Sequence, residues 1–267
     1  MEENIGKSVN QEEKELLFLK VDQLKRGSHG LSLLLRTDDT IVALNKLPIR
    51  GSQKLFNQKL KENDENIITI LRRNTFFNLR ASGSLGIKLN EVSSEESEDL
   101  LKKTNEYLNK IDSYEGYKDF EVYKGSNNLY NEIEINELSL LASLLPFVWF
   151  FHHKLYTPLF LLMGTLLLLG SIEWWLFLAA WVIITIYMSK SSLSLLRGYC
   201  LFNEMKIFMK IYAKNNVEAQ RILRSLDKKS HYVFPLIEAP LTDLEIERLS
   251  KKEKETSNLD QVEAQVT

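Results

Sequence analysis

The sequence predicts an α+β chain, in which a small β-rich N-terminal domain precedes an α-helical membrane hairpin and cytoplasmic amphipathic helices. Three observations predict this class. Short runs of β-branched and aromatic residues, separated by turn residues, occupy the N-terminal third and are typical of strands. Residues 155–188 form an apolar stretch whose only charged residue is Glu173. After it, apolar and basic residues recur at helical spacing.

The apolar stretch is too long for one transmembrane helix. Its 34 residues would make a helix of about 51 Å, whereas the hydrocarbon core of a bilayer is about 30 Å thick. A break at Gly170-Ser171 gives two helices near the lower length limit for spanning. We therefore expect a transmembrane hairpin with Glu173 in its turn and Trp174 and Trp175 at headgroup level. The alternative is a buried hairpin in a soluble protein.

Charge places the two ends of the hairpin. The predicted turn carries no lysine or arginine, whereas Lys154 precedes the hairpin and Lys190, Arg197 and Lys206 follow it. By the positive-inside rule the turn faces outward and both termini are cytoplasmic. We expect a bacterial source, and in a bacterium spanning helices rather than a barrel imply the inner membrane.

Two further features of the sequence agree with this location. The single cysteine, Cys200, excludes an intrachain disulfide and fits a reducing compartment. Residues 1–14 are polar and acidic, so we expect a flexible start and no cleaved signal peptide.

The order of predicted elements between residues 15 and 90 alternates strands with one helix. Residues 16–19 fit a strand or the start of a helix, and residues 40–45 fit a strand. Residues 52–61 read as a short amphipathic helix. Residues 67–71 and 76–79 then form two strands of a hairpin.

Residues 38–49, DDTIVALNKLPI, resemble the bacterial PDZ pattern of a glycine-aspartate turn, an apolar strand, an asparagine-glycine turn and a proline-isoleucine pair. The resemblance covers about residues 15–90 and implies a domain that binds a peptide as an added strand, through backbone N–H groups of a glycine-containing loop. Asp38 and Lys46 stand where the family has glycines. The matching loop is Ser84, Leu85, Gly86 and Ile87, which follows the hairpin; alternatively, Gly86 supplies only a turn.

Three segments lie between this domain and the hairpin. Residues 93–112 show a capping box and an apolar stripe and predict a helix. Residues 113–137 are tyrosine-rich, with two glycines, and predict a connector. Residues 138–154 contain an apolar run that is too short to span, so we expect an interfacial or re-entrant helix, the alternative being a third span. Its headgroup edge would carry Trp149, His152, His153 and Lys154.

Chemistry-bearing motifs are few. The adjacent histidines point about 100° apart on a helix and cannot hold one metal without further ligands, so polar anchoring explains them. The sequence has no H-E-x-x-H, G-x-S-x-G or P-loop motif. We therefore expect a non-catalytic protein without cofactor or metal.

Residues 189–230 predict a basic amphipathic juxtamembrane helix, whose lysines and arginines contact either anionic lipid or the soluble domain. These basic residues are Lys206, Lys210, Lys214, Arg221 and Arg224. The net charge of −2 gives no signal for nucleic acid. Residues 231–267 predict a short helix, starting near Pro240, and a disordered tail.

Taken together, these patterns predict an inner-membrane adaptor, scaffold or assembly factor that binds the lipid bilayer and a protein partner or membrane complex. The alternative is an accessory subunit of a membrane complex that binds a lipid or redox cofactor near its membrane helices, with His152 or His153 as ligand.

Overall fold

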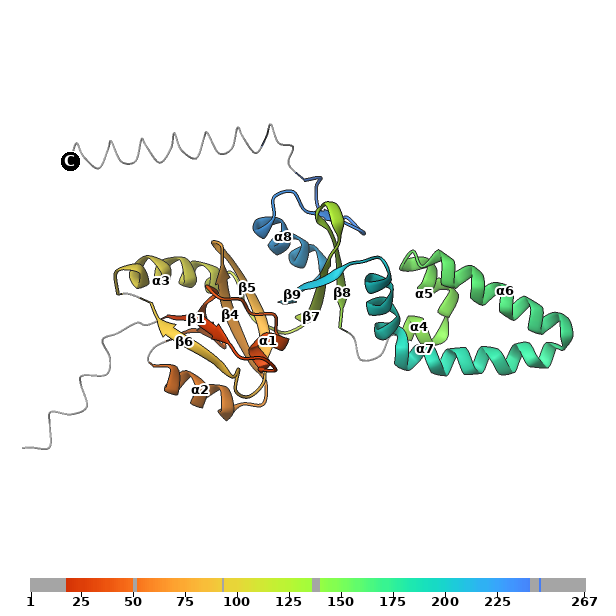
Figure 1. Cartoon of the computed structure of the whole chain (residues 1–267), viewed down its shortest axis with the longest axis horizontal. Coiled ribbons are helices and arrows are strands. Elements are labelled where there is room, and N and C mark those ends of the chain that lie inside the picture. Colours follow the sequence, from red (N-terminus) through yellow and green to blue (C-terminus); the bar gives the residue numbers. More distant parts are fainter. Residues whose placement is uncertain (1–17, 50–51, 93, 136–139, 241–244, 246–267) are drawn as a thin grey trace, which may run out of the picture. The chain divides into compact units, whose positions relative to one another are not determined.

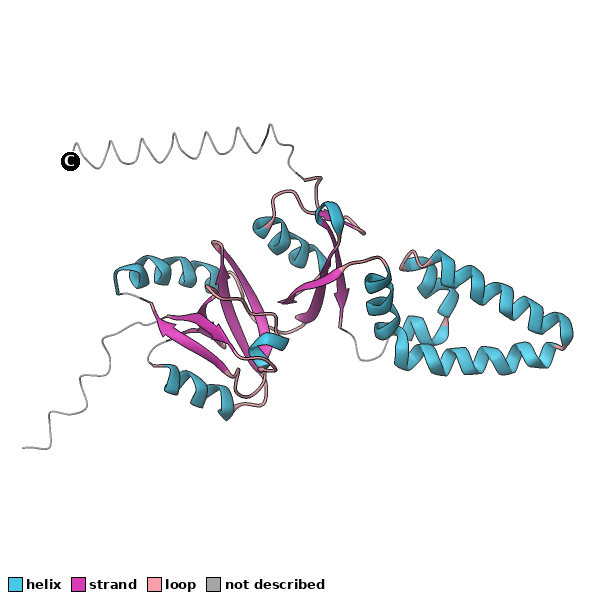
Figure 2. Cartoon of the chain, in the orientation of Figure 1, coloured by secondary structure: helices cyan, strands magenta, loops and turns pink. Residues whose placement is uncertain are grey.

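The computed structural model describes residues 18–49, 52–92, 94–135, 140–240 and 245. The predicted α+β class is confirmed, because helices and one large sheet share the chain (Figures 1 and 2). The chain divides into two compact units. We call residues 1–132 and 207–267 the sheet unit and residues 133–206 the helical unit. The helical unit is therefore an insertion in the sequence of the sheet unit.

The sheet has ten strands, which run in the order β10-β8-β7-β9-β5-β4-β2-β1-β6, with β3 paired to β2. Their bounds are β1 (Leu19–Leu24), β2 (Thr40–Leu44), β3 (Leu47–Pro48), β4 (Asn66–Arg72), β5 (Thr75–Ala81), β6 (Ile87–Glu91), β7 (Lys118–Lys124), β8 (Leu129–Glu134), β9 (Lys206–Ala213) and β10 (His231–Tyr232). The helices are α1 (His29–Ser32), α2 (Gln53–Glu62), α3 (Ser94–Asn109), α4 (Leu140–Leu144), α5 (Pro146–His152), α6 (Tyr156–Ile172), α7 (Trp174–Phe202) and α8 (Asn216–Leu226), with a 3-10 turn, η1, at Ser126–Asn128.

The predicted hairpin of residues 67–71 and 76–79 is confirmed as β4 and β5. Its two-residue turn is Arg73-Asn74, and both residues have positive φ, 46° and 65°. Such primed turns match the right-handed twist of the flanking strands. The pairing sets Ile68 opposite Leu79 and Ile70 opposite Phe77, all four of which are buried in the core.

The predicted helix at 52–61 is confirmed as α2, which buries Phe56 and Leu60 against the sheet. Buried Asn66, the first residue of β4, caps the C-terminal end of α2. Its Nδ2 donates to the carbonyls of Leu60 at 2.9 Å and Asn63 at 3.0 Å. Carbonyls at a helix C-terminus lack intrahelical partners, so this side chain satisfies groups that would otherwise be orphaned.

The predicted strand at 40–45 is present as β2, and Asp39 just before it has a role beyond turn formation. Its carboxylate receives Arg72 Nε at 2.7 Å and Nη2 at 2.6 Å. The two side chains are 2% and 7% exposed. This buried, bidentate ion pair joins the start of β2 to the end of β4.

The sheet unit is larger than the predicted domain of residues 15–90. Two predictions outside that range are wrong. The expected connector at 113–137 contains β7 and β8, and β7 is buried on both faces, by Phe120 and Val122 on one and by Glu121 and Tyr123 on the other. The expected helix at 189–230 is interrupted: α7 continues to Phe202, β9 follows, and α8 begins at Asn216.

The helical unit has a core of its own. It gathers Ala142 of α4, Trp149 and Phe150 of α5, Leu159 of α6 and Met188 of α7. The expected single helix at 138–154 is two short helices, because Pro146 starts α5 at a position where its missing N–H costs nothing. The helix predicted for 93–112 is present as α3.

Helices α6 and α7 pack side by side as a hairpin (Figure 1). Their junction is Glu173, with extended backbone (φ −151°, ψ 126°), two residues beyond the predicted break at Gly170-Ser171. Gly170 remains helical, and a Cβ there would lie 3.7 Å from the Cβ of Phe177. The predicted flexible start (1–14) and most of the predicted C-terminal helix and tail lie outside the described residues.

Candidate membrane segment and peptide-binding edge

The α6-α7 hairpin presents large apolar side chains on its outer surface. Leu161 is 74% exposed, Leu167 70% and Ile183 67%. By length and composition α7, with 29 residues, is the one described helix able to cross a membrane, and α6 is a shorter apolar helix of 17 residues. Continuous apolar surface of this kind is uncommon on soluble proteins and marks contact with a membrane or a partner.

Both connections of the helical unit lead to one place in the sheet. The chain leaves β8 to enter the helical unit and returns from it into β9. In the sheet, β8 and β9 lie on either side of β7. The polypeptide before and after the hairpin therefore belongs to a single folded sheet.

The residues predicted to lie at a headgroup interface have different surroundings. Trp174 and Trp175 are 70% and 63% exposed and follow Glu173 at the hairpin turn. Trp149, in contrast, is 2% exposed, so it is a core residue of the helical unit. Lys154 is exposed and follows α5 with φ 54°.

His152 and His153 lie at the C-terminal end of α5, and their rings are 5.2 Å apart and nearly perpendicular. The His153 ring also contacts the ring of Trp149 at a tilt of 54°, with centroids 4.7 Å apart. Burial and the adjacent His152 lower the pKa of His153 to about 4, which keeps its ring neutral at physiological pH. Across the described residues, no cluster of three or more His, Cys, Asp or Glu side chains could hold a metal.

The loop Ser84-Leu85-Gly86-Ile87 leads into β6, which hydrogen-bonds only to β1 in the described sheet and so forms one of its edges. Leu85 is fully buried, and its carbonyl accepts from Gly30 N at 2.8 Å. Gly86 has φ +63°, and a Cβ there would lie 3.2 Å from Ser28 Cβ. Turn geometry thus accounts for this glycine, and peptide binding by the loop stays a prediction.

The free edge of β6 is bridged by one side chain of α2. Gln53 Nε2 donates to Ile87 O at 3.0 Å, and Gln53 Oε1 accepts from Leu89 N at 3.4 Å. These are the two backbone groups that an added strand would use. The amide of Gln53 therefore satisfies an edge that would otherwise be open to pairing.

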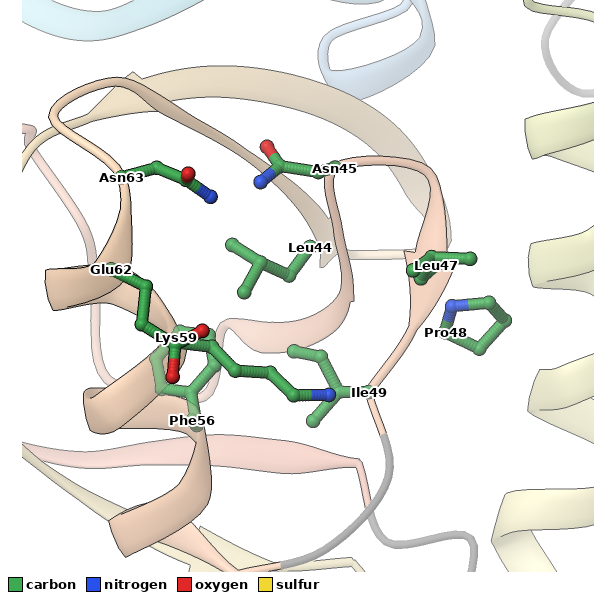
Figure 3. Close-up of a pocket in the computed structure, with 9 residues that line it drawn as sticks. All are labelled: Leu44, Asn45, Leu47, Pro48, Ile49, Phe56, Lys59, Glu62 and Asn63. Carbon is green, nitrogen blue, oxygen red and sulfur yellow. The ribbon is translucent and has the colours of Figure 1, made fainter.

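A small hollow lies between α2 and the β2-β3 turn (Figure 3). Its volume is about 190 Å³, below the range of about 300 to 1,000 Å³ typical of ligand pockets. Side chains of both elements surround it in the close-up: Leu44, Asn45, Leu47, Pro48, Ile49, Phe56, Lys59, Glu62 and Asn63. Its size favours one apolar side chain of a partner rather than a metabolite.

The five basic residues predicted to face lipid do not share a helix. Lys206 and Lys210 belong to β9, Lys214 follows that strand, and Arg221 and Arg224 belong to α8. Arg224 is a structural residue, because its guanidinium donates to Ser230 O at 3.0 Å and Ala239 O at 3.0 Å. The expected basic helical face is therefore absent from this part of the described chain.

Sequence reasoning missed a buried acid in β8. Glu132 is 8% exposed, and it accepts a hydrogen bond from Gln220 Nε2 of α8 while its Oε2 has no partner. Burial raises the pKa of Glu132 to about 7, against a smaller lowering by the Gln220 hydrogen bond. Glu132 lies between Asn131 and Ile133 and, two residues on, Glu134 follows in the same alternation, so the sequence pattern does not separate a buried glutamate from an exposed one.

Sequence reasoning also missed a group of cations around Arg36 and Arg72. The signal was available in the consecutive Arg72-Arg73 at the end of a predicted strand.

Comparison with models of known protein families found no match to this chain, and comparison with curated proteins found none either.

Proposed function

We propose that the chain is a non-catalytic membrane adaptor of a bacterial inner membrane, in which the α6-α7 hairpin is the anchor and the sheet unit binds a protein partner at the cytoplasmic face. The observation that carries the proposal is the insertion of an outwardly apolar helical hairpin between two strands of one sheet.

The sheet supports a hairpin that returns to its starting side. β8 and β9 both pair with β7, which supports a hairpin whose two ends lie on one side of the membrane. This arrangement favours an even number of crossings. Helices α4 and α5, of five and seven residues, are also too short to add a third span.

Basic residues support a cytoplasmic sheet unit. Lys154 before α6 and Lys190 within α7 are exposed, whereas the turn at Glu173 has no lysine or arginine. The positive-inside rule therefore favours an outward turn and a cytoplasmic sheet. Both termini then lie in the cytoplasm.

Partner binding is supported by the edge of β6. Added strands gain affinity from backbone hydrogen bonds and specificity from pockets for alternate side chains. When the side chain of Gln53 moves away, β6 offers the carbonyl of Ile87 and the N–H of Leu89 to an added strand. The loop 84–87 directly precedes these groups. The PDZ-like order of elements motivates the same mode of binding.

Cysteine labelling tests the topology. Single cysteines at Lys61, Ile172 and Arg221, three exposed positions, would be introduced into a Cys200→Ala background. In intact cells with a permeable outer membrane, a membrane-impermeant maleimide should label only position 172. Labelling of position 61 or 221 from outside would overturn the proposed orientation.

Photo-crosslinking tests the binding edge. A photoreactive residue at exposed Asn90 of β6 should yield a discrete adduct with a protein partner in cells. Gln53→Ala should increase the yield, because it frees the two backbone groups, whereas Lys54→Ala, at the neighbouring exposed position, should not. Equal yields from both variants would contradict strand addition at this edge.

A further inference from the structure

A cavity lies in the sheet unit, apart from the hairpin and from β6. The cavity has a volume of about 340 Å³, within the range of about 300 to 1,000 Å³ of small-molecule pockets. Four cations and one carboxylate line it, together with two aromatic rings and a leucine: Arg36, Arg72, Arg73, Lys124, Asp227, Tyr130, Phe208 and Leu226.

The four cations come from three separate segments that the fold brings together. Arg36 precedes β2, and its guanidinium lies 4.4 Å from the centre of the Phe208 ring and donates to Phe208 O at 3.0 Å. Arg72 ends β4, and Arg73 occupies the β4-β5 turn. Lys124 ends β7, with Nζ 3.5 Å from Asp227 Oδ2.

The carboxylates near the cavity are too few to neutralise these cations. Asp39 neutralises Arg72, and Asp227 is shared between Lys124 and the hydroxyl of Tyr130, which donates to it at 2.9 Å. Arg36 and Arg73 form no salt bridge within the described residues. Two positive charges thus remain without a matching acid at the cavity.

One buried hydrogen-bond donor also remains unused. Arg72 is 6% exposed, yet its Nη1 has no hydrogen-bond partner, although Nε and Nη2 have theirs. A buried donor on a charged group is costly to leave unpaired. Burial and the nearby Arg72 also lower the pKa of Arg36, as expected for crowded cations.

We propose that this cavity binds a phosphoryl group, with Arg72 Nη1, Arg36 and Arg73 as its donors. Guanidinium groups suit phosphate because they donate in a planar fork to two oxygens at once. A doubly charged phosphomonoester would match the two unneutralised cations, which a single carboxylate would not. Tyr130, Phe208 and Leu226 then contact the apolar part of the same ligand.

Two sources can supply such a group: a soluble phosphate ester or the headgroup of a phosphomonoester lipid. The full chain would be reconstituted into phosphatidylcholine nanodiscs and titrated with inorganic phosphate by calorimetry, at constant ionic strength with chloride. Nanodiscs with added phosphatidic acid would be compared by hydrogen exchange of the backbone around Arg72-Arg73. Saturable phosphate binding identifies the soluble source, and exchange protection only with phosphatidic acid identifies the lipid source.

Arg73→Gln is the test variant, because Arg73 is exposed and lies in a turn that glutamine can occupy as readily. It should weaken binding about ten- to a hundredfold, the effect of losing one charged hydrogen bond. Arg26→Gln, which removes a charge from an exposed position outside the cavity, should leave binding unchanged. Equal weakening by both variants, or no response to either phosphate source, would overturn the proposal.

Discussion

Replacement of Ile183 by aspartate tests whether the α6-α7 hairpin lies in a membrane or faces water. Ile183 lies near the middle of the apolar part of α7, nine residues after Trp174, which is about 14 Å along the helix axis. Its side chain is 67% exposed in the folded chain. The two environments therefore predict opposite outcomes for the same substitution.

The expected difference in free energy is large. On a water-exposed surface, a substitution of this kind changes the free energy of unfolding by no more than about 0.5 kcal/mol. At the centre of a membrane helix, aspartate costs about 2.5 to 3.5 kcal/mol and the lost isoleucine adds about 0.3 to 0.6. The total of about 3 to 4 kcal/mol lowers the inserted fraction by two to three orders of magnitude.

The assay is the share of the expressed chain that stays in the membrane pellet after alkaline carbonate extraction. Ile183→Asp should move most of the chain out of that pellet. Ile183→Leu controls for side-chain size, and Leu201→Asp places the same charge at a 62% exposed position in the last turn of α7. If Ile183→Asp stays in the pellet like the wild type, the membrane assignment of α7 is refuted.

Three further predictions concern the sheet unit. Burial raises the pKa of Glu132 from 4.5 to about 7 in the folded chain. Between these two pH values the unfolded chain has lost this proton while the folded chain keeps it. The free energy of unfolding therefore falls by up to about 3 kcal/mol as the pH rises from about 4.5 to about 7. Glu132→Gln should abolish this fall in urea unfolding of the full chain followed by far-UV circular dichroism; an unchanged pH profile would assign it to another group. Asp39→Ala leaves buried Arg72 unpaired and should cost about 3 to 5 kcal/mol by hydrogen exchange of β2 and β4, and a loss under about 1 kcal/mol would contradict that estimate. Asn66→Ala orphans two carbonyls at the end of α2 and should cost about 1 to 3 kcal/mol in the same assay, with faster exchange confined to the neighbourhood of that helix end.

The elements that sequence predicted correctly are those with local signals. The β4-β5 hairpin combines apolar runs with a turn at Arg73-Asn74, and α2 shows a helical stripe ending near Leu60. The strand β9 has an ambiguous pattern, because lysines spaced four residues apart, at 206, 210 and 214, share a face in a helix and in a strand alike. Spacing alone therefore could not identify it.

Contacts between distant residues account for the rest of what sequence could not predict. Asp39 and Arg72 are separated by 33 residues, and Glu132 and Gln220 by 88. No periodicity in the sequence indicates which acidic residue pairs with which partner. The cavity around Arg36 and Arg73 likewise exists only because β4, β7, β8 and β9 join one sheet.

The position of β9 also dictates an order of events during synthesis. This strand lies between β7 and β5, so it connects the β8-β7 pair to the remaining strands on the other side. The ribosome makes it only after both helices of the hairpin have been made. The sheet therefore cannot be completed until the whole helical unit has been translated, and until then its strands form two unjoined groups with unpaired edges exposed to proteases and chaperones.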